Sequence, residues 1–297
     1  MTKSVEDDGA VTVAAMAADG LYRATVPRDG GRVLHLFSRT ARSYRLFDGL
    51  PAAAGGGAYF RQHPLTGEWI SYSGVRQGRT FLPNVAECPL CPMTDGGPTT
   101  DIPVDDYEVA IFTNRFAALT PDAGPPPEMM LETRPGTGVC DVVSYSADHN
   151  ASLSTIGPDR IVLLLDALAM RCDELMANPD IAYVMPFENR GREIGVTLDH
   201  PHGQIYAMSQ LQDRIEKVAA AFRHDDPLSG LAERLPQQLV LAQNDSGIAF
   251  VPPWARYPFE VWIVPHQRVA DLASLGRTAR ADMAGLLHIA AGKLDKV

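Results

Sequence analysis

Apolar residues recur along the chain at two spacings, which predict a mixture of helices and strands. In residues 158–175 an apolar side chain returns every three to four positions after an initial proline, a pattern typical of a helix with one buried face. The same periodicity predicts helices over residues 210–222 and from 277 to about 294. Shorter apolar runs bounded by turn residues predict strands, which cover residues 68–73, 107–113, 138–145, 181–187, 238–243, 248–251 and 258–265.

The order of these elements predicts the fold class. Strands and helices follow one another without a regular strand–helix–strand repeat, and the chain has neither a glycine-rich dinucleotide fingerprint nor a P-loop. We therefore expect an α+β fold built on a mainly antiparallel sheet. Residues 1–57 carry weaker patterns and end in an alanine- and glycine-rich linker; within this leader, two strand-like runs at 33–37 and 43–47 predict a hairpin.

The run from Thr197 to Tyr206 is the centre of the predicted site. His200, His202 and Gln204 alternate in it, so an extended backbone would direct all three to one face. A neutral imidazole is a competent nucleophile, and a carboxamide can donate a hydrogen bond to a phosphoryl oxygen. The pattern predicts transfer of a phosphorus-containing group through a covalent histidine intermediate. A pair of core or metal-binding histidines is the alternative interpretation.

A second motif, Cys88-Pro-Leu-Cys91, is typical of a zinc half-site or of a redox pair. A redox motif usually opens a helix, whereas Pro92 and the polar loop behind it disfavour a helix here. A zinc site needs two more ligands, and His149 and His200 are the available candidates.

Two arginines, Arg76 and Arg79, stand on either side of a glycine. They fit either a solvated surface loop or a bidentate clamp for phosphate.

Composition narrows the class of protein. The chain has 297 residues with a formal net charge of −10, which disfavours general nucleic-acid binding because the phosphate backbone would be repelled. No apolar run approaches the roughly 18 to 20 residues of a membrane span, and the N-terminus lacks the plan of a signal peptide. Four cysteines, two of them close together, fit a reducing compartment better than a disulfide framework, so we expect a cytoplasmic protein.

Several independent motifs occur in the order found in the galactose-1-phosphate uridylyltransferase family, the transferase branch of the histidine-triad superfamily, and the chain resembles that family over residues 59–297. The matching segments are Pro64-Leu-Thr-Gly-Glu-Trp69, Arg76-x-x-Arg79, Cys88-x-x-Cys91, Phe112-Thr-Asn114, Asp148-His149, Phe187-Glu-Asn-x-Gly191, His200-Pro-His-Gly-Gln204, Val251-Pro-Pro-Trp-Ala255 and Pro258-Phe-Glu260.

The resemblance implies two histidine-triad-like halves, each with a mainly antiparallel sheet flanked by helices. Residues 58–209 would form the half with zinc and nucleophile, and residues 210–297 the start of the second half. The family continues with a further histidine-rich segment, so we expect a truncated chain or one part of a split enzyme. A homodimer, or pairing with a separate C-terminal half, is the implied assembly.

The implied reaction belongs to galactose metabolism and uses UDP-glucose and galactose 1-phosphate. His202 would attack the α-phosphorus of UDP-glucose, and Gln204 with the two arginines would stabilise the phosphoryl charge. The resemblance also implies that Cys88, Cys91, His149 and His200 hold a structural zinc ion. For the nucleotide, the resemblance implies contacts from Asn114, Asn189 and Thr197, with Phe112 and Val142 near the uracil.

Two alternatives remain open at this point. Another nucleotidyltransferase or phosphorylase of the same branch would use the same histidine and glutamine with a different base. A zinc-stabilised nucleotide-binding fragment without activity would keep the pocket and lose the turnover.

Overall fold

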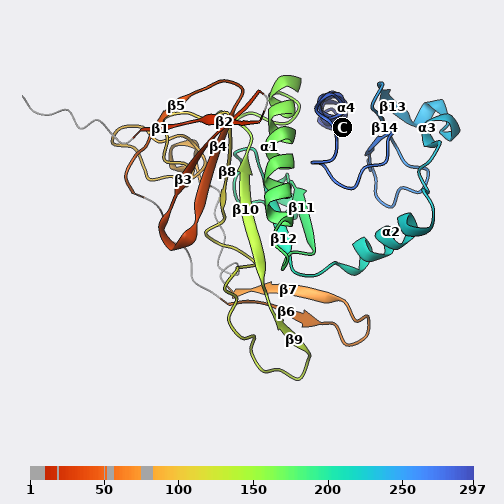
Figure 1. Cartoon of the computed structure of the whole chain (residues 1–297), viewed down its shortest axis with the longest axis horizontal. Helices are drawn as coiled ribbons and strands as arrows, with labels where there is room; N and C mark the ends of the chain where they lie inside the picture. Colours follow the sequence, from red (N-terminus) through yellow and green to blue (C-terminus); the bar gives the residue numbers. More distant parts are fainter. Residues whose placement is uncertain (1–10, 19, 50, 52–56, 75–82) are drawn as a thin grey trace, which may run out of the picture.

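The computed structural model describes residues 11–18, 20–49, 51, 57–74 and 83–297. At its centre lies a sheet of seven strands in the order β11-β12-β10-β8-β4-β3-β2 (Figure 1). Every neighbouring pair in this sheet is antiparallel, which confirms the predicted α+β fold. The strands are β2 Ala15–Ala18, β3 Leu21–Pro27, β4 Val33–Ser38, β8 Val109–Thr113, β10 Gly138–Ser144, β11 Tyr183–Phe187 and β12 His202–Met208.

The leader contributes three strands to this sheet, and the hairpin predicted within it is wrong. Strand β4 pairs with β3 on one side and with β8 on the other. The second strand-like run forms β5 (Ser43–Arg45), which pairs instead with β1 (Val11–Val13) in a separate two-stranded sheet. Both runs form strands as predicted, but local sequence does not specify which strand each of them pairs with.

Helix α1 (Pro158–Met176) covers one face of the large sheet. It begins with a proline in its first turn, where the missing N–H costs nothing, and buries Ile161, Leu164 and Leu175. Leu164 and Leu175 pack in one cluster with apolar residues of β8, β10 and β12, so the helix and the sheet share one core. The opposite face packs on the β1–β5 sheet and on the segment around residues 88–107.

The C-terminal part builds a second, smaller layer beside α1 (Figure 1). Strands β13 (Val240–Gln243), β14 (Gly247–Phe250) and β15 (Trp262–Pro265) form an antiparallel sheet, and α4 (Arg277–Leu294) packs on it and on α1.

A buried carboxylate ties the two layers together. Asp166 of α1 accepts from Arg39, which follows β4, and from Arg280 of α4, each at 2.8 Å. Two guanidinium groups around one buried carboxylate leave no unpaired negative charge in the interface.

The remaining elements are short. A three-stranded sheet in the order β7-β6-β9 lies at one end of the large sheet, and α2 leads from β12 to the C-terminal layer (Figure 1). No helix in the described part of the chain is long and apolar enough to span a membrane. The bounds are β6 Ala58–Gln62, β7 Trp69–Ser73, β9 Thr133–Pro135, α2 Asp213–His224 and α3 Leu231–Arg234, with 3-10 turns η1 Asp29–Gly31, η3 Val85–Glu87, η4 Arg192–Ile194 and η5 Gln237–Leu239.

Candidate functional site

Two cysteines and two histidines from three separate segments converge on one point. Cys88 and Cys91 lie in the turn after η3, His149 follows β10, and His200 precedes β12. Their candidate ligand atoms all lie within 4.8 Å of one another. The Sγ atom of Cys91 is 3.5 Å from the Nδ1 atoms of both His149 and His200, and the Sγ atom of Cys88 is 3.6 Å from Nδ1 of His200. These residues could hold a metal ion.

Hydrogen bonds orient the His200 ring toward the two sulfur atoms. Its Nε2 lies 2.8 Å from the backbone oxygen of Ser146, which favours a proton on Nε2 and a lone pair on Nδ1. The buried Tyr107 hydroxyl is 3.1 Å from the same Nε2 and 2.7 Å from both the Leu90 backbone oxygen and the Ser144 hydroxyl. Such outer contacts fix the tautomer that a metal ligand needs.

Burial changes the protonation of the side chains in this cluster. It lowers the pKa of the His200 imidazole to about 4, so the ring is neutral at physiological pH, as a ligand must be. Burial, with the neighbouring Cys88 second, raises the pKa of the Cys91 thiol to about 12. Two adjacent thiolates would therefore need a bound cation to offset their charge, and the donor set of two sulfurs and two nitrogens suits one.

His202 is the first residue of strand β12, and its side chain contacts a backbone oxygen. Its Nδ1 lies 2.8 Å from the backbone oxygen of His200, so a proton on Nδ1 leaves the lone pair on Nε2. His202 and Gln204 lie at alternate positions of the strand, and both are half-buried. The expected convergence of His200 with them is wrong, because His200 precedes the strand and turns into the cysteine cluster.

Gln204 lies in a row of side chains that crosses the sheet. It pairs with Val142 of β10 and with Phe187 of β11, and Val142 pairs in turn with Phe112 of β8. Phe112 lies beside Leu34 of β4. Residues paired across neighbouring strands share a face, so Gln204, Val142, Phe112 and Leu34 form one row, whose Phe112 and Leu34 are buried in the core. The structure thus brings together three of the predicted substrate-binding residues.

The residue between His202 and Gln204 must be small. A Cβ atom on Gly203 would come within 2.4 Å of the Tyr145 hydroxyl and 2.8 Å of the Phe187 backbone oxygen, on the α1 side of the sheet. Any larger residue at position 203 would displace the strand and with it the two side chains that face the other way.

A cavity of ≈ 240 Å³ opens in front of His202. The connection between β11 and β12 lines it with Asn189, Val196 and Leu198. The predicted Thr197 stands between the last two and is half-buried. Asn189 and His202 therefore line one cavity.

An acid also lines the His202 cavity, and sequence reasoning did not single it out. Burial raises the pKa of the Glu188 carboxyl, while Arg190 and a hydrogen bond from Tyr145 oppose the rise. Its signal in the sequence is the position directly after β11, next to the predicted Asn189.

The other predicted residues lie further away or outside the described part. Asn114 is buried just past β8. Its side-chain oxygen accepts from the backbone N–H of Phe116 at 2.9 Å, and its own backbone N–H donates to the Cys140 backbone oxygen at 2.9 Å. Arg76 and Arg79 lie outside the described residues.

Three residues around the cysteine cluster were also missed. Tyr107, Ser144 and Ser146 support His200 through the hydrogen bonds given above. Their sequence signal is weak because a tyrosine or a serine at a strand end is common.

Comparison with known proteins agrees with this arrangement. Residues 60–212 match the model of the family described as "Galactose-1-phosphate uridyl transferase, N-terminal domain". The chain is 34% identical over 248 residues to the galactose-1-phosphate uridylyltransferase of Thermotoga maritima, which covers 80% of this chain and 76% of that protein.

Two further relatives support the same assignment. The Streptomyces lividans galactose-1-phosphate uridylyltransferase is 36% identical over 230 residues, which span 75% of this chain and 60% of that protein. A solved uridylyltransferase aligns with a TM-score of 0.66 and 29% identity, covering 77% of this chain and 73% of the other. The chain belongs to the galactose-1-phosphate uridylyltransferase family.

Proposed function

We propose that this protein transfers a uridylyl group from UDP-glucose to galactose 1-phosphate, a step of galactose metabolism, through a covalent adduct on His202. The observation that carries the proposal is the 2.8 Å contact between Nδ1 of His202 and the His200 backbone oxygen. This contact gives Nε2 the lone pair that a nucleophile needs. The names of the relatives support the choice of substrates.

The two steps balance without a general acid. In the first, Nε2 of His202 bonds to the α-phosphorus, and the bond from phosphorus to the glucose 1-phosphate oxygen breaks, that oxygen keeping the electron pair. In the second, a phosphate oxygen of galactose 1-phosphate bonds to phosphorus, and the phosphorus–nitrogen bond returns its electrons to Nε2. A sugar phosphate leaves readily, so Gln204 can serve as a donor that carries no titratable proton.

The row that starts at Gln204 would receive the nucleoside. Phe112 and Val142, which pair across β8 and β10, would lie near the uracil, because the flat ring of a base packs well on apolar and aromatic side chains. Asn114, Asn189 and Thr197 would supply polar contacts to the nucleotide. Arg76 and Arg79, which lie outside the described residues, would clamp the phosphates as the resemblance implies.

We also propose that the cysteine–histidine cluster holds zinc in a structural role. Four protein donors close a tetrahedral site and leave no position for substrate, which is the pattern of structural zinc sites. Because His200 supplies both a ligand atom and the backbone oxygen that contacts His202, a rigid metal site would position the nucleophile.

We also propose a division into two domains and an assembly of two copies. Residues 58–209 would form the half with metal and nucleophile and residues 210–297 part of the second half, which is supported by the separate sheet of β13, β14 and β15. Two copies would pair, and sedimentation of the purified chain would measure the mass of the assembly.

Labelling tests the proposed function directly. Incubation with UDP-glucose radiolabelled in its uridylyl group should leave one label per site and release glucose 1-phosphate. A phosphoramidate is labile in acid and stable in alkali, so the label should share these properties. Label from an adenine sugar nucleotide, with none from UDP-glucose, would favour a phosphorylase or adenylyltransferase; UDP binding without any label would favour an inactive fragment.

A further inference from the structure

Gly203, the residue between His202 and Gln204, lies directly against a buried tyrosine. A Cβ atom on Gly203 would come within 2.4 Å of the Tyr145 hydroxyl and 3.3 Å of its Cζ. The hydroxyl therefore fills the space of a side chain at position 203, on the face opposite His202 and Gln204. Tyr145 is 4% exposed and belongs to the core beneath α1, so its ring has a fixed place.

Tyr145 and Glu188 are the first residues beyond the two strands that flank β12. His202 pairs with the last residue of β10, and Gln204 pairs with the last residue of β11. The Tyr145 hydroxyl donates a hydrogen bond to the Glu188 carboxylate. This bond passes behind Gly203 and joins the end of β10 to the end of β11 at the point where β12 begins.

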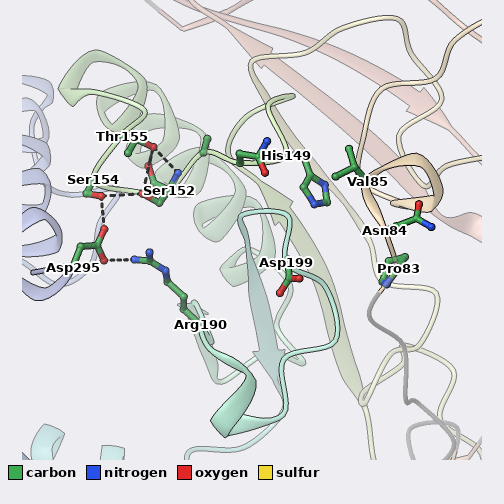
Figure 2. A pocket seen from close by; sticks show the side chains of 12 residues that line it. Pro83, Asn84, Val85, His149, Ser152, Ser154, Thr155, Arg190, Asp199 and Asp295 are labelled. Atoms are coloured by element: carbon green, nitrogen blue, oxygen red, sulfur yellow. Dashed lines mark hydrogen bonds and ion pairs between the residues drawn. The ribbon is translucent and has the colours of Figure 1, made fainter. Parts of the chain in front are cut away.

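The charges around Glu188 are consistent with this hydrogen bond. Burial, with the Glu188 charge second, raises the pKa of the Tyr145 hydroxyl well above its usual value, so the hydroxyl keeps its proton and donates. Arg190 lines the His202 cavity together with Glu188, but it reaches toward Asp295, with Nη1 2.5 Å from an Asp295 oxygen (Figure 2). Arg190 and Asp295 also line a neighbouring cavity of ≈ 770 Å³.

The start of β12 is paired more completely on one side than on the other. The ladder to β10 includes His202 and Gly203, whereas the ladder to β11 stops at Gln204. Strand ends that lack a neighbour open more readily than paired segments. The bond between Tyr145 and Glu188 links the end of β11 across this segment, which carries the His202 backbone.

We propose that the Tyr145–Glu188 hydrogen bond positions the nucleophile, with Glu188 as a positioning residue. This inference rests on the proposed function, which makes His202 the nucleophile. The bond holds the backbone of His202 and Gly203 between β10 and β11 and thereby fixes the distance from Nε2 of His202 to the phosphorus. In this role Glu188 accepts a hydrogen bond and transfers no proton.

Single-turnover labelling of the full chain by radiolabelled UDP-glucose tests the proposal. Tyr145→Phe keeps the buried ring and removes the hydroxyl, and it should slow labelling roughly 10- to 100-fold, the cost of a small displacement of a reacting group. The UDP-glucose concentration that gives half the maximal rate should change less than about 3-fold, because no contact to substrate is removed.

Variants of Glu188 show whether the pair acts as one unit. Glu188→Ala should slow labelling as much as Tyr145→Phe, and the double variant should be no slower, because all three lack the same hydrogen bond. Glu188→Gln should recover most of the rate, since its amide oxygen still accepts from the Tyr145 hydroxyl.

A matched control is Tyr183→Phe, which removes a half-buried hydroxyl at the other end of β11. It should take up label at the parent rate. A parent rate in Tyr145→Phe would overturn the proposal. Glu188→Gln that is as slow as Glu188→Ala would also overturn it, because Glu188 would then act through its charge or its proton.

A second measurement needs no turnover and separates this inference from the proposed function. With isotope-labelled histidine, NMR can follow the proton on Nδ1 of His202, which the His200 backbone oxygen protects from water. Tyr145→Phe should make this proton exchange faster, because the start of β12 opens more often. If the parent takes no label, the proposed function fails and this exchange rate decides: faster exchange in Tyr145→Phe would keep the positioning role, and an unchanged rate would overturn it.

Discussion

The two faces of the seven-stranded sheet each bury a histidine whose pKa is lowered to about 4, chiefly by burial. On one face, His200 lies among two thiols and a second imidazole, and its Nε2 contacts Ser146 and Tyr107. On the α1 face, His35 lies among charged side chains, with Nδ1 3.0 Å from the Thr25 hydroxyl. The pKa therefore does not distinguish the two histidines.

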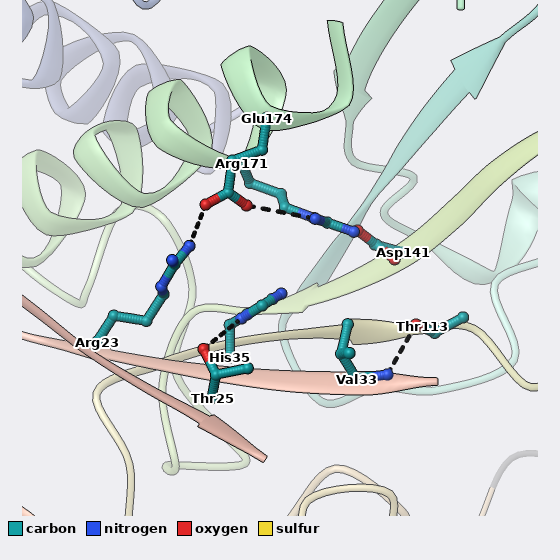
Figure 3. A network of polar contacts seen from close by, with 8 residues as sticks. All are labelled: Arg23, Thr25, Val33, His35, Thr113, Asp141, Arg171 and Glu174. Carbon is teal, nitrogen blue, oxygen red and sulfur yellow. Dashed lines mark hydrogen bonds and ion pairs between the residues drawn. The ribbon is translucent and has the colours of Figure 1, made fainter. Parts of the chain in front are cut away.

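The α1 face holds a network of ion pairs rather than a site (Figure 3). Asp141 of β10 pairs with Arg171 of α1 at 2.8 Å, Arg171 also bonds Glu174, and Glu174 pairs with Arg23 of β3. Each charge meets an opposite one, and no pair of soft donors is present among these side chains. The network ties α1 to the sheet.

The comparison shows that two features distinguish a functional site from a structural ion-pair network: the chemical identity of the donor atoms and the access of a ligand to them. The face with His200 combines soft donors, the proposed nucleophile His202 and two cavities, whereas the network beneath α1 consists of hard charges that pair with one another. If this distinction is correct, changes on the first face should alter chemistry or metal content, and changes in the network should alter stability alone.

The largest expected effect is that of His202→Ala, which removes the proposed nucleophile. Uridylyl transfer should fall by roughly 10⁵-fold or more, the scale seen when a nucleophile is deleted. The label from UDP-glucose should disappear, while the metal content and the unfolding midpoint stay near those of the parent. His35→Gln on the opposite face is the control and should take up label normally. Undiminished labelling of His202→Ala would refute the mechanism.

Removal of a ligand from the proposed metal site should have the next largest effect, which we expect on stability. Freshly purified protein should contain about one zinc ion per chain, and Cys88→Ser should lower the free energy of unfolding on the order of 5 kcal/mol, part of the binding energy of a structural zinc ion. Cys172→Ser, which changes a half-buried thiol of α1, should leave the zinc content intact. Elemental analysis that finds no zinc in unchelated parent protein would exclude the site.

The sequence predicted these regions unequally, and the reason is physical. Strong periodicity located α1 within one residue at each end, and it located both ends of α4. Pairing across long distances was not predictable: β4 joins β8 about 75 residues away, and the direction of His200 depends on contacts with Tyr107 and Ser146.

The cavities were the least predictable part of the site. Arg190 and Asp295 bond to each other and line one cavity of ≈ 770 Å³, although 105 positions separate them. No local pattern reports such a contact, because it depends on how α4 packs on α1. The four residues of the cysteine–histidine cluster and His202, by contrast, belong to short motifs whose spacing carries the information.

On the α1 face, Asp141→Asn should leave the half-buried Arg171 guanidinium with Glu174 as its remaining carboxylate, at 3.3 Å. We expect the free energy of unfolding to fall by about 3 kcal/mol, measured in urea, because a buried ion pair that loses its nearer partner is costly. The double variant Asp141→Val with Arg171→Met should lose much less, since both charges are removed. Labelling per folded molecule should be unchanged in both. A loss of labelling without a loss of stability would break the distinction between the two faces.

Gln204→Ala tests the nucleophile's face with a smaller effect. If Gln204 donates to the phosphoryl oxygens in the transition state, uridylyl transfer should slow by roughly 10² to 10³-fold, as when one oxyanion donor is removed. The affinity for UDP should weaken much less, because the ground state carries less charge at that position. Equal losses of affinity and rate, from calorimetry and single-turnover labelling, would assign Gln204 to substrate binding instead.

The smallest expected effect is the pH dependence that His35 gives to stability. Its pKa is about 4 in the folded protein and near 6.5 when unfolded, because burial and then the charges of Arg171 and Arg23 disfavour its proton while Glu174 opposes them. The unfolded chain therefore binds the proton first, so stability is full above pH 6.5 and falls as the pH drops toward 4. The two pKa values correspond to a loss of about 2 kcal/mol at pH 5. Unfolding in urea at pH 7 and pH 5 should show this difference shrinking in His35→Gln. An equal pH dependence in parent and variant would mean that the α1 face does not sense protons through His35.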